Sequence, residues 1–268
     1  MDLPVYRVKA RNTSADSENR IHDDSVASRF GFRGGLVPGV TIYGYMTVPI
    51  VERFPEWLER GRMTVRFVQP LYDGDEVTVR ATFEDASNGT VLTVDVLQDD
   101  RAVSAIATAH LNSENGIPPR ACDYPEADLP DRPGRPTATP ETLKPGTVLG
   151  TLVERVDLEG NQEFLEQIEE RLPCYRGPNA VAHPAYLLGL SNQVFLNNFA
   201  LGPWIHAASE VTNWSTVRTS EVITVRARVV SCYERKGHDF AVLDVLIASG
   251  DRIVQQVRHT TIYRPRVG

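Results

Sequence analysis

One histidine, His22, lies a single loop upstream of a glycine-rich turn and of the apolar stretch that follows it. An imidazole titrates near neutral pH, so His22 is a candidate general acid or base. The turn at 31–35 leads to Pro38 and Gly39, where the apolar stretch begins. Backbone N–H groups at the start of a buried helix can polarise a carbonyl oxygen as charge develops on it. The stretch 17–46 is therefore predicted to hold a site for an acyl carbonyl.

Proline has no N–H, so Gly39 and Val40 are the expected donors, and Gly39 also lets an acyl group approach closely. Proton transfer normally needs a second group beside His22. The nearby acids are Asp16, Glu18, Asp23 and Asp24. A capping or solvent-exposed role is the alternative for each acid, and a structural role in its loop is the alternative for the histidine.

The elements that position these groups are predicted from apolar periodicity. A strand over 3–10 precedes a short helix over about 23–29 and a helix over 39–53 that is apolar on more than one face. Four segments then alternate apolar and polar residues between turn signals: 63–67, 76–81, 90–96 and 102–107. These patterns predict an α+β unit in which an antiparallel sheet wraps a buried helix.

A proline-rich segment without periodicity follows at 114–146. Its composition predicts an extended linker that lies against the surface. A partner-binding proline-rich segment is the alternative, which the lack of a basic PxxP signature disfavours.

After this linker the same order of elements returns. A strand, a charged helix, an apolar helix and four strands are predicted at 148–156, 161–171, 183–198, 207–217, 221–230, 240–247 and 252–263. Arg33 and Arg176 each precede a glycine in a turn, 143 positions apart (176 − 33), and EVTVRA at 76–81 matches EVITVRA at 221–227. The pattern indicates a tandem duplication. Two similar sheets can pair edge to edge within one chain, which would remove two exposed edges.

The duplicated unit and the stretch 17–46 resemble the MaoC-like, (R)-specific enoyl-CoA hydratase group. In that family a D-x-N-P-x-H segment supplies an aspartate and a histidine, and a later H-G opens the central helix. The corresponding segments here are SENRIH at 17–22 and PG at 38–39, so Asn19, His22 and Gly39 match. The family's aspartate, proline and helix-opening histidine are replaced by Ser17, Arg20 and Pro38.

The resemblance covers most of residues 1–112 and implies a tandem (double) hotdog fold of class α+β. Each half would be an antiparallel sheet wrapped around a long central helix. The expected division is an N-terminal hotdog at 1–113, the linker at 114–146 and a C-terminal hotdog at 147–268.

The same resemblance implies catalytic roles for His22, Gly39 and Asn19. The segment 183–193 is similar to the central-helix segment of polyketide dehydratase double hotdogs, although that family's acid is missing from it. The expected substrate-binding residues are Arg33, Gly34, Gly35, Val40, Tyr43, His183, Asn192 and Gln193. Arg33, like Arg176, is a natural contact for the phosphates of a CoA or carrier arm. Two alternatives stay open. In one, Arg33 serves only to stabilise its turn, and in the other, the side-chain amides of Asn192 and Gln193 serve only as hydrogen-bond partners for backbone groups of the strands. The remaining strand and turn histidines are expected to be structural: His206, His238 and His259.

The activity that the resemblance implies is reversible addition of water to a 2-enoyl thioester of CoA or of a carrier. A hotdog thioesterase and a non-catalytic acyl-CoA-binding subunit are the alternatives, the latter because the family acids are missing. No cofactor or metal is expected, since CoA or phosphopantetheine would be part of the substrate. The expected partner is a small-molecule acyl thioester, and family habit suggests a homodimer.

Composition narrows the function classes. A net charge of −7 with dispersed arginines argues against nucleic-acid binding. Three scattered cysteines indicate free thiols in a reducing compartment, and no apolar run approaches the roughly 20 residues of a membrane span. We therefore expect a cytoplasmic protein that binds neither nucleic acid nor membranes. The sequence contains no H-E-x-x-H, CxxC, G-x-S-x-G or P-loop motif.

Overall fold

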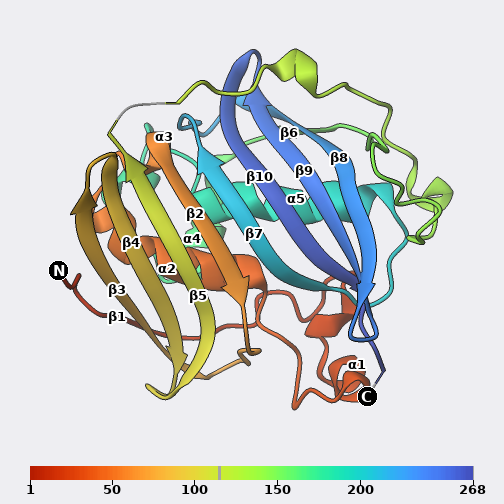
Figure 1. Ribbon diagram of the computed structural model, residues 1–268, viewed down its shortest axis with the longest axis horizontal. Helices are drawn as coiled ribbons and strands as arrows, with labels where there is room; N and C mark the ends of the chain where they lie inside the picture. The colour runs from red at the N-terminus through yellow and green to blue at the C-terminus, as the bar shows by residue number, and fades with distance from the viewer. Residues whose placement is uncertain (114–115, 268) are drawn as a thin grey trace.

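The computed structural model describes residues 1–113 and 116–267, and its strands form one continuous ten-stranded sheet (Figure 1). In chain order the strands are β1 (Tyr6–Lys9), β2 (Gly61–Phe67), β3 (Glu76–Ala86), β4 (Gly89–Gln98), β5 (Ala102–Asn112), β6 (Leu152–Arg155), β7 (Ile205–Asn213), β8 (Val222–Arg235), β9 (His238–Ser249) and β10 (Arg252–Arg264). They lie side by side in the order β1-β3-β4-β5-β2-β7-β10-β9-β8-β6. The β2–β7 pairing, with Val65 opposite Ser209, joins the two halves edge to edge as predicted.

Two helices of 15 residues each, α2 (Gly39–Arg53) and α5 (Pro184–Asn198), pack against each other on one face of this sheet (Figure 1). Every residue of α2 from Thr41 to Val51 is buried, which confirms the prediction of a helix that is apolar on more than one face. Proline at the first position of α5 starts that helix without losing an intrahelical hydrogen bond. Each half of the sheet therefore covers one long central helix.

Shorter elements complete the chain. They are α1 (Asp24–Ala27), α3 (Trp57–Arg60), α4 (Leu158–Gln167) and the 3₁₀ turns η1 (Arg20–His22), η2 (Ser28–Phe30), η3 (Ala121–Asp123), η4 (Arg132–Gly134) and η5 (Pro173–Tyr175). The helix predicted over 23–29 is thus α1 followed by η2. Helix α4 ends before residue 171, where the pattern had placed its end, because Glu169 adopts a left-handed backbone with φ of 55°.

Strand β6 is shorter than the predicted 148–156. The side chain of Asn198 takes both backbone groups of Gly150, accepting from its N–H at 2.6 Å and donating to its carbonyl at 2.9 Å. These bonds replace ladder hydrogen bonds, so regular pairing begins only at Leu152.

The first part of the linker, including residues 121–126, lies on the outer face of the second half of the sheet. Its later part runs to the helix side, where Ala138 donates to the carbonyl of Ala200 and Leu143 is buried in the core. The Tyr124 hydroxyl donates to Asp244 of β9 at 2.9 Å, and Arg226 of β8 donates to the carbonyl of Ala121. Residues 114 and 115 lie outside the described part of the chain. Within that part, no helix is long and apolar enough to cross a membrane.

Candidate active site

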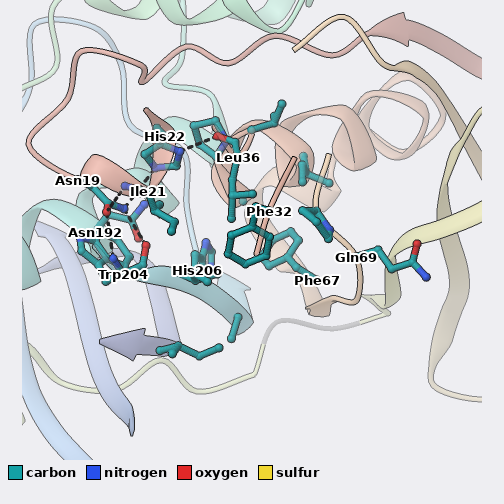
Figure 2. Close-up of a pocket in the computed structure, with 18 of the residues that line it drawn as sticks. Asn19, Ile21, His22, Phe32, Leu36, Phe67, Gln69, Asn192, Trp204 and His206 are labelled. Carbon is teal, nitrogen blue, oxygen red and sulfur yellow. Dashed lines mark hydrogen bonds between the residues drawn. The ribbon is translucent and has the colours of Figure 1, made fainter. Parts of the chain in front are cut away.

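A cavity of about 260 Å³ lies at the amino-terminal end of α2 (Figure 2). Its walls come from both halves. The first half supplies the loop and η1 before α2, the start of α2, and the end of β2 with the three residues after it. The second half supplies one residue of α5, the start of β7, the start of β9 and the end of β10. A second cavity of about 250 Å³ adjoins it. The two share five lining residues: Asn19, His22, Pro38, Asn192 and Trp204. The shared wall means that one extended ligand could run through both.

The protonation state of His22 follows from its two hydrogen bonds. Its Nδ1 lies 2.6 Å from the carbonyl oxygen of Leu36, and a carbonyl only accepts, so Nδ1 carries the proton. Its Nε2 lies 3.3 Å from Nδ2 of Asn19, which only donates, so Nε2 offers a lone pair. Burial lowers the pKa of His22 below its ordinary value, although the bond to Leu36 opposes that shift. His22 is therefore a neutral base at neutral pH.

Asn19 is held in one orientation by the backbone of the second half. Its Nδ2 donates to the carbonyl of Trp204 at 2.9 Å, and its Oδ1 accepts from the Trp204 N–H at 3.1 Å. A flipped amide would place like groups opposite each other at both contacts, so the orientation is set by this pair. The second N–H of the amide is then directed at His22 (Figure 2).

Free backbone donors lie at the start of α2. The N–H groups of Thr41 and Ile42 both donate to the carbonyl of Pro38, at 3.0 and 3.2 Å. Over residues 1–113 and 116–267, the N–H groups of Gly39 and Val40 have no hydrogen-bond partner. A helix amino terminus with unpaired N–H groups attracts negative charge.

Glycine is required by space at two positions near His22. A Cβ on Gly39 would lie 2.9 Å from both Nδ1 of His206 and Cε2 of Phe67. A Cβ on Gly35 would lie 2.0 Å from the carbonyl oxygen of His22, which leaves no room for any side chain. Gly39 thus keeps the cavity open, and Gly35 lets the loop close over the histidine.

The other predicted site residues divide into two groups. Asn192 lines both cavities, and Val40 and Gln193 line the second. The turn residues Arg33, Gly34 and Gly35 do not line either cavity, nor do Tyr43 and His183.

Each residue of this second group has a contact that explains its place. Arg33 forms an ion pair with Asp75 and its guanidinium lies 4.2 Å from the centre of the Tyr72 ring. Asp24 accepts from the N–H of Gly35 at 2.7 Å, and a Cβ on Gly34 would lie 3.0 Å from the same carboxylate. These residues shape the loop around His22.

Tyr43 and His183 belong to the core. Burial raises the pKa of the Tyr43 hydroxyl and lowers the pKa of His183, which keeps both side chains neutral. Nδ1 of His183 accepts from the N–H of Ala185 at 3.1 Å and so caps α5. Its Nε2 lies 3.8 Å from the carboxylate of Glu170, which is buried as well.

No carboxylate in the described part of the chain lines either cavity. Of the four nearby acids, Glu18 pairs with Arg135 at 2.8 Å, and Asp23 caps α1 by accepting from the Val26 N–H at 3.0 Å. Asp24 holds the turn at Gly35, and Asp16 is exposed. The same described residues contain no cluster of His, Cys, Asp and Glu that could hold a metal ion. The groups that can carry a proton in the first cavity are therefore histidines.

Sequence reasoning did not identify three residues of this site. His206 and His238, both expected to be structural, line the first cavity from the starts of β7 and β9. The backbone of Trp204 holds Asn19 (Figure 2). Their strand pattern contains no sign of this role, because only the pairing of β2 with β7 brings the start of β7 to α2.

Comparisons with known proteins place this geometry in context. No protein-family model matches the chain, and no curated protein matches it in sequence. Solved structures do match. A provisionally assigned MaoC domain protein dehydratase from Chloroflexus aurantiacus superposes with a TM-score of 0.68 at 9% identity, over 98% of this chain and 95% of that one.

Rv0216 from Mycobacterium tuberculosis, which has a double hotdog fold, superposes with a TM-score of 0.66 at 14% identity, over 97% and 96% of the two chains. The acyl-CoA thioesterase II TesB2 from Mycobacterium marinum gives a TM-score of 0.55 at 14% identity, over 87% and 92%. The expected α+β double hotdog fold is confirmed. Over nearly its full length, this chain has the fold seen in MaoC-like dehydratases and in hotdog thioesterases.

Proposed function

We propose that the protein catalyses the reversible addition of water to a 2-enoyl thioester, with His22 as the proton-transfer group. The observation that carries the proposal is the pairing of two features where the two cavities meet, because His22 lines both, Gly39 lines the first and Val40 lines the second. The lone pair of His22 Nε2 is held by Asn19, and the free N–H groups of Gly39 and Val40 lie at the start of α2. A base beside an oxyanion site suits addition to a carbon conjugated with a carbonyl.

The proposed hydration begins with water as nucleophile. Water replaces Nδ2 of Asn19, 3.3 Å away, as the donor to Nε2 of His22. Nε2 then takes a proton from this water as the water oxygen bonds to the β-carbon, and the double-bond electrons move to the thioester oxygen. The N–H groups of Gly39 and Val40 stabilise the resulting enolate oxygen. The imidazolium of His22 then gives its proton to the α-carbon, which restores the neutral ring. A single histidine serves both proton transfers, so this scheme needs no carboxylate in the cavity.

The second cavity suits the carrier arm of such a substrate. Its walls include polar side chains that can bind amide groups: Ser14, Ser17, Gln167, Asn192 and Gln193. The first cavity has apolar walls around Phe32, Ile42 and Phe67, which suit an acyl chain. We therefore assign the pantetheine arm to the second cavity and the acyl chain to the first.

The direct test is the absorbance of a panel of trans-2-enoyl-CoA substrates of varied chain length. Wild-type protein is expected to remove the enoyl signal, and His22→Ala to lower kcat by about 10²–10⁴-fold. His110→Ala is the matched control, because His110 is exposed on β5 and lines neither cavity. Equal rates for wild type and His22→Ala would exclude the histidine from the reaction.

A thioesterase is the second candidate, favoured by the match to thioesterases of the same fold. In that reaction water would attack the thioester carbonyl, so release of free thiol from acyl-CoA distinguishes it from hydration. Binding of acyl-CoA without turnover of any substrate in the panel would instead favour a non-catalytic subunit.

We also propose that the protein is a homodimer, and a measurement of its mass in solution tests this.

A further inference from the structure

Besides His22 and His238, His206 lines the first cavity, and one of its ring nitrogens is buried without a partner among the described residues. His206 is 6% exposed and lines the first cavity, and its Nδ1 has no hydrogen-bond partner among the described residues. That nitrogen lies 2.9 Å from the place where a Cβ on Gly39 would be. The unpaired nitrogen is therefore next to the residue whose N–H is one of the two free donors of α2.

The other nitrogen of His206 begins a buried hydrogen-bonded chain. Its Nε2 lies 2.8 Å from Oγ of Ser209, and that oxygen lies 3.1 Å from Nδ1 of His259. The two imidazole rings are 4.3 Å apart. Both His259 and Ser209 are buried, and Nε2 of His259 has no partner among the described residues.

The Ser209 hydroxyl can donate one hydrogen bond and accept another. The hydrogen-bonded chain therefore has two neutral arrangements in which this hydroxyl donates to one ring and accepts from the other. In the first, His206 donates to the hydroxyl and the hydroxyl donates to His259, which leaves Nδ1 of His206 as a bare acceptor. In the second, His259 donates to the hydroxyl and the hydroxyl donates to His206, so that Nδ1 of His206 carries a proton beside Gly39. Each arrangement leaves one donor and one acceptor unsatisfied, one at Nδ1 of His206 and the other at Nε2 of His259.

Both rings stay neutral at neutral pH. Burial and the neighbouring His259 lower the pKa of His206 well below its ordinary value, although a backbone interaction with Ala208 opposes the shift. Burial lowers the pKa of His259 to about 3. A neutral imidazole N–H can serve as an electrophile for a carbonyl oxygen, because it donates a hydrogen bond without giving up its proton.

We propose that Nδ1–H of His206 is a third donor to the thioester oxygen, alongside the N–H groups of Gly39 and Val40. A carbonyl or enolate oxygen at the start of α2 is an acceptor, so it selects the arrangement in which His206 donates. Ser209 and His259 are positioning residues that hold this tautomer. This proposal rests on one part of the proposed function, namely that the cavity binds an acyl thioester. The donor would serve hydration and hydrolysis alike.

Substitutions of His206 separate hydrogen bonding from packing. His206→Phe keeps a ring but removes the donor, so kcat is expected to fall about 10²-fold with KM within about three-fold. His206→Asn keeps an N–H near the position of Nδ1 and is expected to retain kcat within about ten-fold of wild type. The pH dependence of kcat should be the same for wild type and His206→Asn, because His206 keeps its proton.

Ser209→Ala is the second variant, since it removes one oxygen and leaves both rings in place. It frees the tautomer of His206 and is expected to lower kcat about ten-fold. His206→Phe with kcat within three-fold of wild type would overturn the inference, as would Ser209→Ala with full activity.

A measurement without turnover completes the test. The probe is an acyl-CoA analogue in which CH₂ replaces the thioester sulfur, with a ¹³C label at the resulting ketone. Infrared spectra of the bound analogue are expected to show a lower carbonyl frequency in wild type than in His206→Phe. Equal frequencies would overturn the role of His206 while leaving hydration by wild type intact. If wild type neither binds the analogue nor turns over any thioester, the proposed function itself fails, and the inference with it.

Discussion

At the scale of single residues, Asn19 links the two halves to the chemistry. Its side chain makes four hydrogen bonds, two with the backbone of Trp204, one with the N–H of Ile21 and one with His22. The amide thus connects a backbone position near β7 to the tautomer of a ring on η1. A residue that fixes the lone pair of a base can be as important as the base itself.

Substitution of Asn19 should therefore affect both stability and turnover. Asn19→Ala leaves the buried N–H and carbonyl of Trp204 without partners, which is expected to lower the free energy of unfolding by about 1–3 kcal/mol. Asn19→Asp cannot donate to Nε2 of His22 and attracts a proton there, so kcat is expected to fall at least about 10²-fold. Urea unfolding and enoyl-CoA turnover measure the two effects. Asn197→Ala is the control, because the Asn197 amide bonds only to the Gln193 carbonyl in the described chain. An Asn19→Asp variant with wild-type kcat would contradict the role assigned to Asn19 beside His22.

The pH dependence of turnover tests the base assignment separately. His22 acts in its neutral form, and burial lowers its pKa below the ordinary value of 6.5. Protonation at lower pH blocks Nε2, so kcat/KM is expected to be constant at neutral pH and to fall with an inflection below 6.5. Asn19→Asp should move the inflection upward, because a carboxylate stabilises the imidazolium. A rate that rises as the pH falls through 6.5 would instead indicate that His22 acts as an acid.

At the scale of elements, the start of α2 brings the site together, and Gly39→Ala tests it. The added methyl group would meet His206 and Phe67 at 2.9 Å, so it narrows the cavity beside the free N–H groups. We expect kcat/KM to fall about 10²-fold, and the free energy of unfolding to fall by about 1–3 kcal/mol because one of these two rings must shift to admit the methyl group.

The matched control for this variant is Gly44→Ala in the same helix. A Cβ there would lie 3.1 Å from Cδ1 of Ile168, the end of a flexible side chain, and Gly44 lines neither cavity. Its activity should remain at the wild-type level. Equal activity losses in the two variants would mean that any methyl group on α2 disturbs the protein, and that Gly39 has no special place.

The elements also show which features the sequence could predict. Helix 39–53 was predicted to both ends because its apolar residues recur without interruption from Gly39. The end of α4 was missed because Glu169 turns left-handed, and the length of β6 because Asn198 bonds Gly150 from a distant helix. Such contacts depend on tertiary neighbours and leave no local pattern. The roles assigned to His22 and Gly39 remain predictions, although the structure brings both to one cavity.

At the scale of the whole molecule, the cavity exists only where the two halves meet. The β2–β7 pairing makes one sheet of two. Trp204, just before β7, and His206 on β7 thereby reach a cavity whose proposed base, His22, comes from η1. The linker also connects the two halves at this site. Arg135 donates hydrogen bonds to Glu18, before η1, and to the carbonyl of Leu196 on α5. The two halves differ at this cavity, since one contributes His22 and the other His206.

The neutral histidines of this interior make the whole fold sensitive to acid. His183, His206 and His259 are buried, and burial lowers the pKa of each. In the unfolded chain an imidazole takes up a proton as the pH falls below 6.5, whereas the native ring of His259 does so only near its pKa of about 3. The unfolded state then binds more protons than the native state, so the free energy of unfolding falls as the pH is lowered through this range.

His259 alone is expected to remove about 2 kcal/mol of stability between about pH 7.5 and about pH 5, since its native ring stays neutral over that range. Urea unfolding of wild type at the two pH values measures the total loss. The loss for His259→Gln should be smaller by about 2 kcal/mol, because glutamine does not titrate. A loss of the same size in both proteins would show that the native ring of His259 accepts a proton well above pH 5, which would also remove the basis for treating the His206–Ser209–His259 chain as neutral.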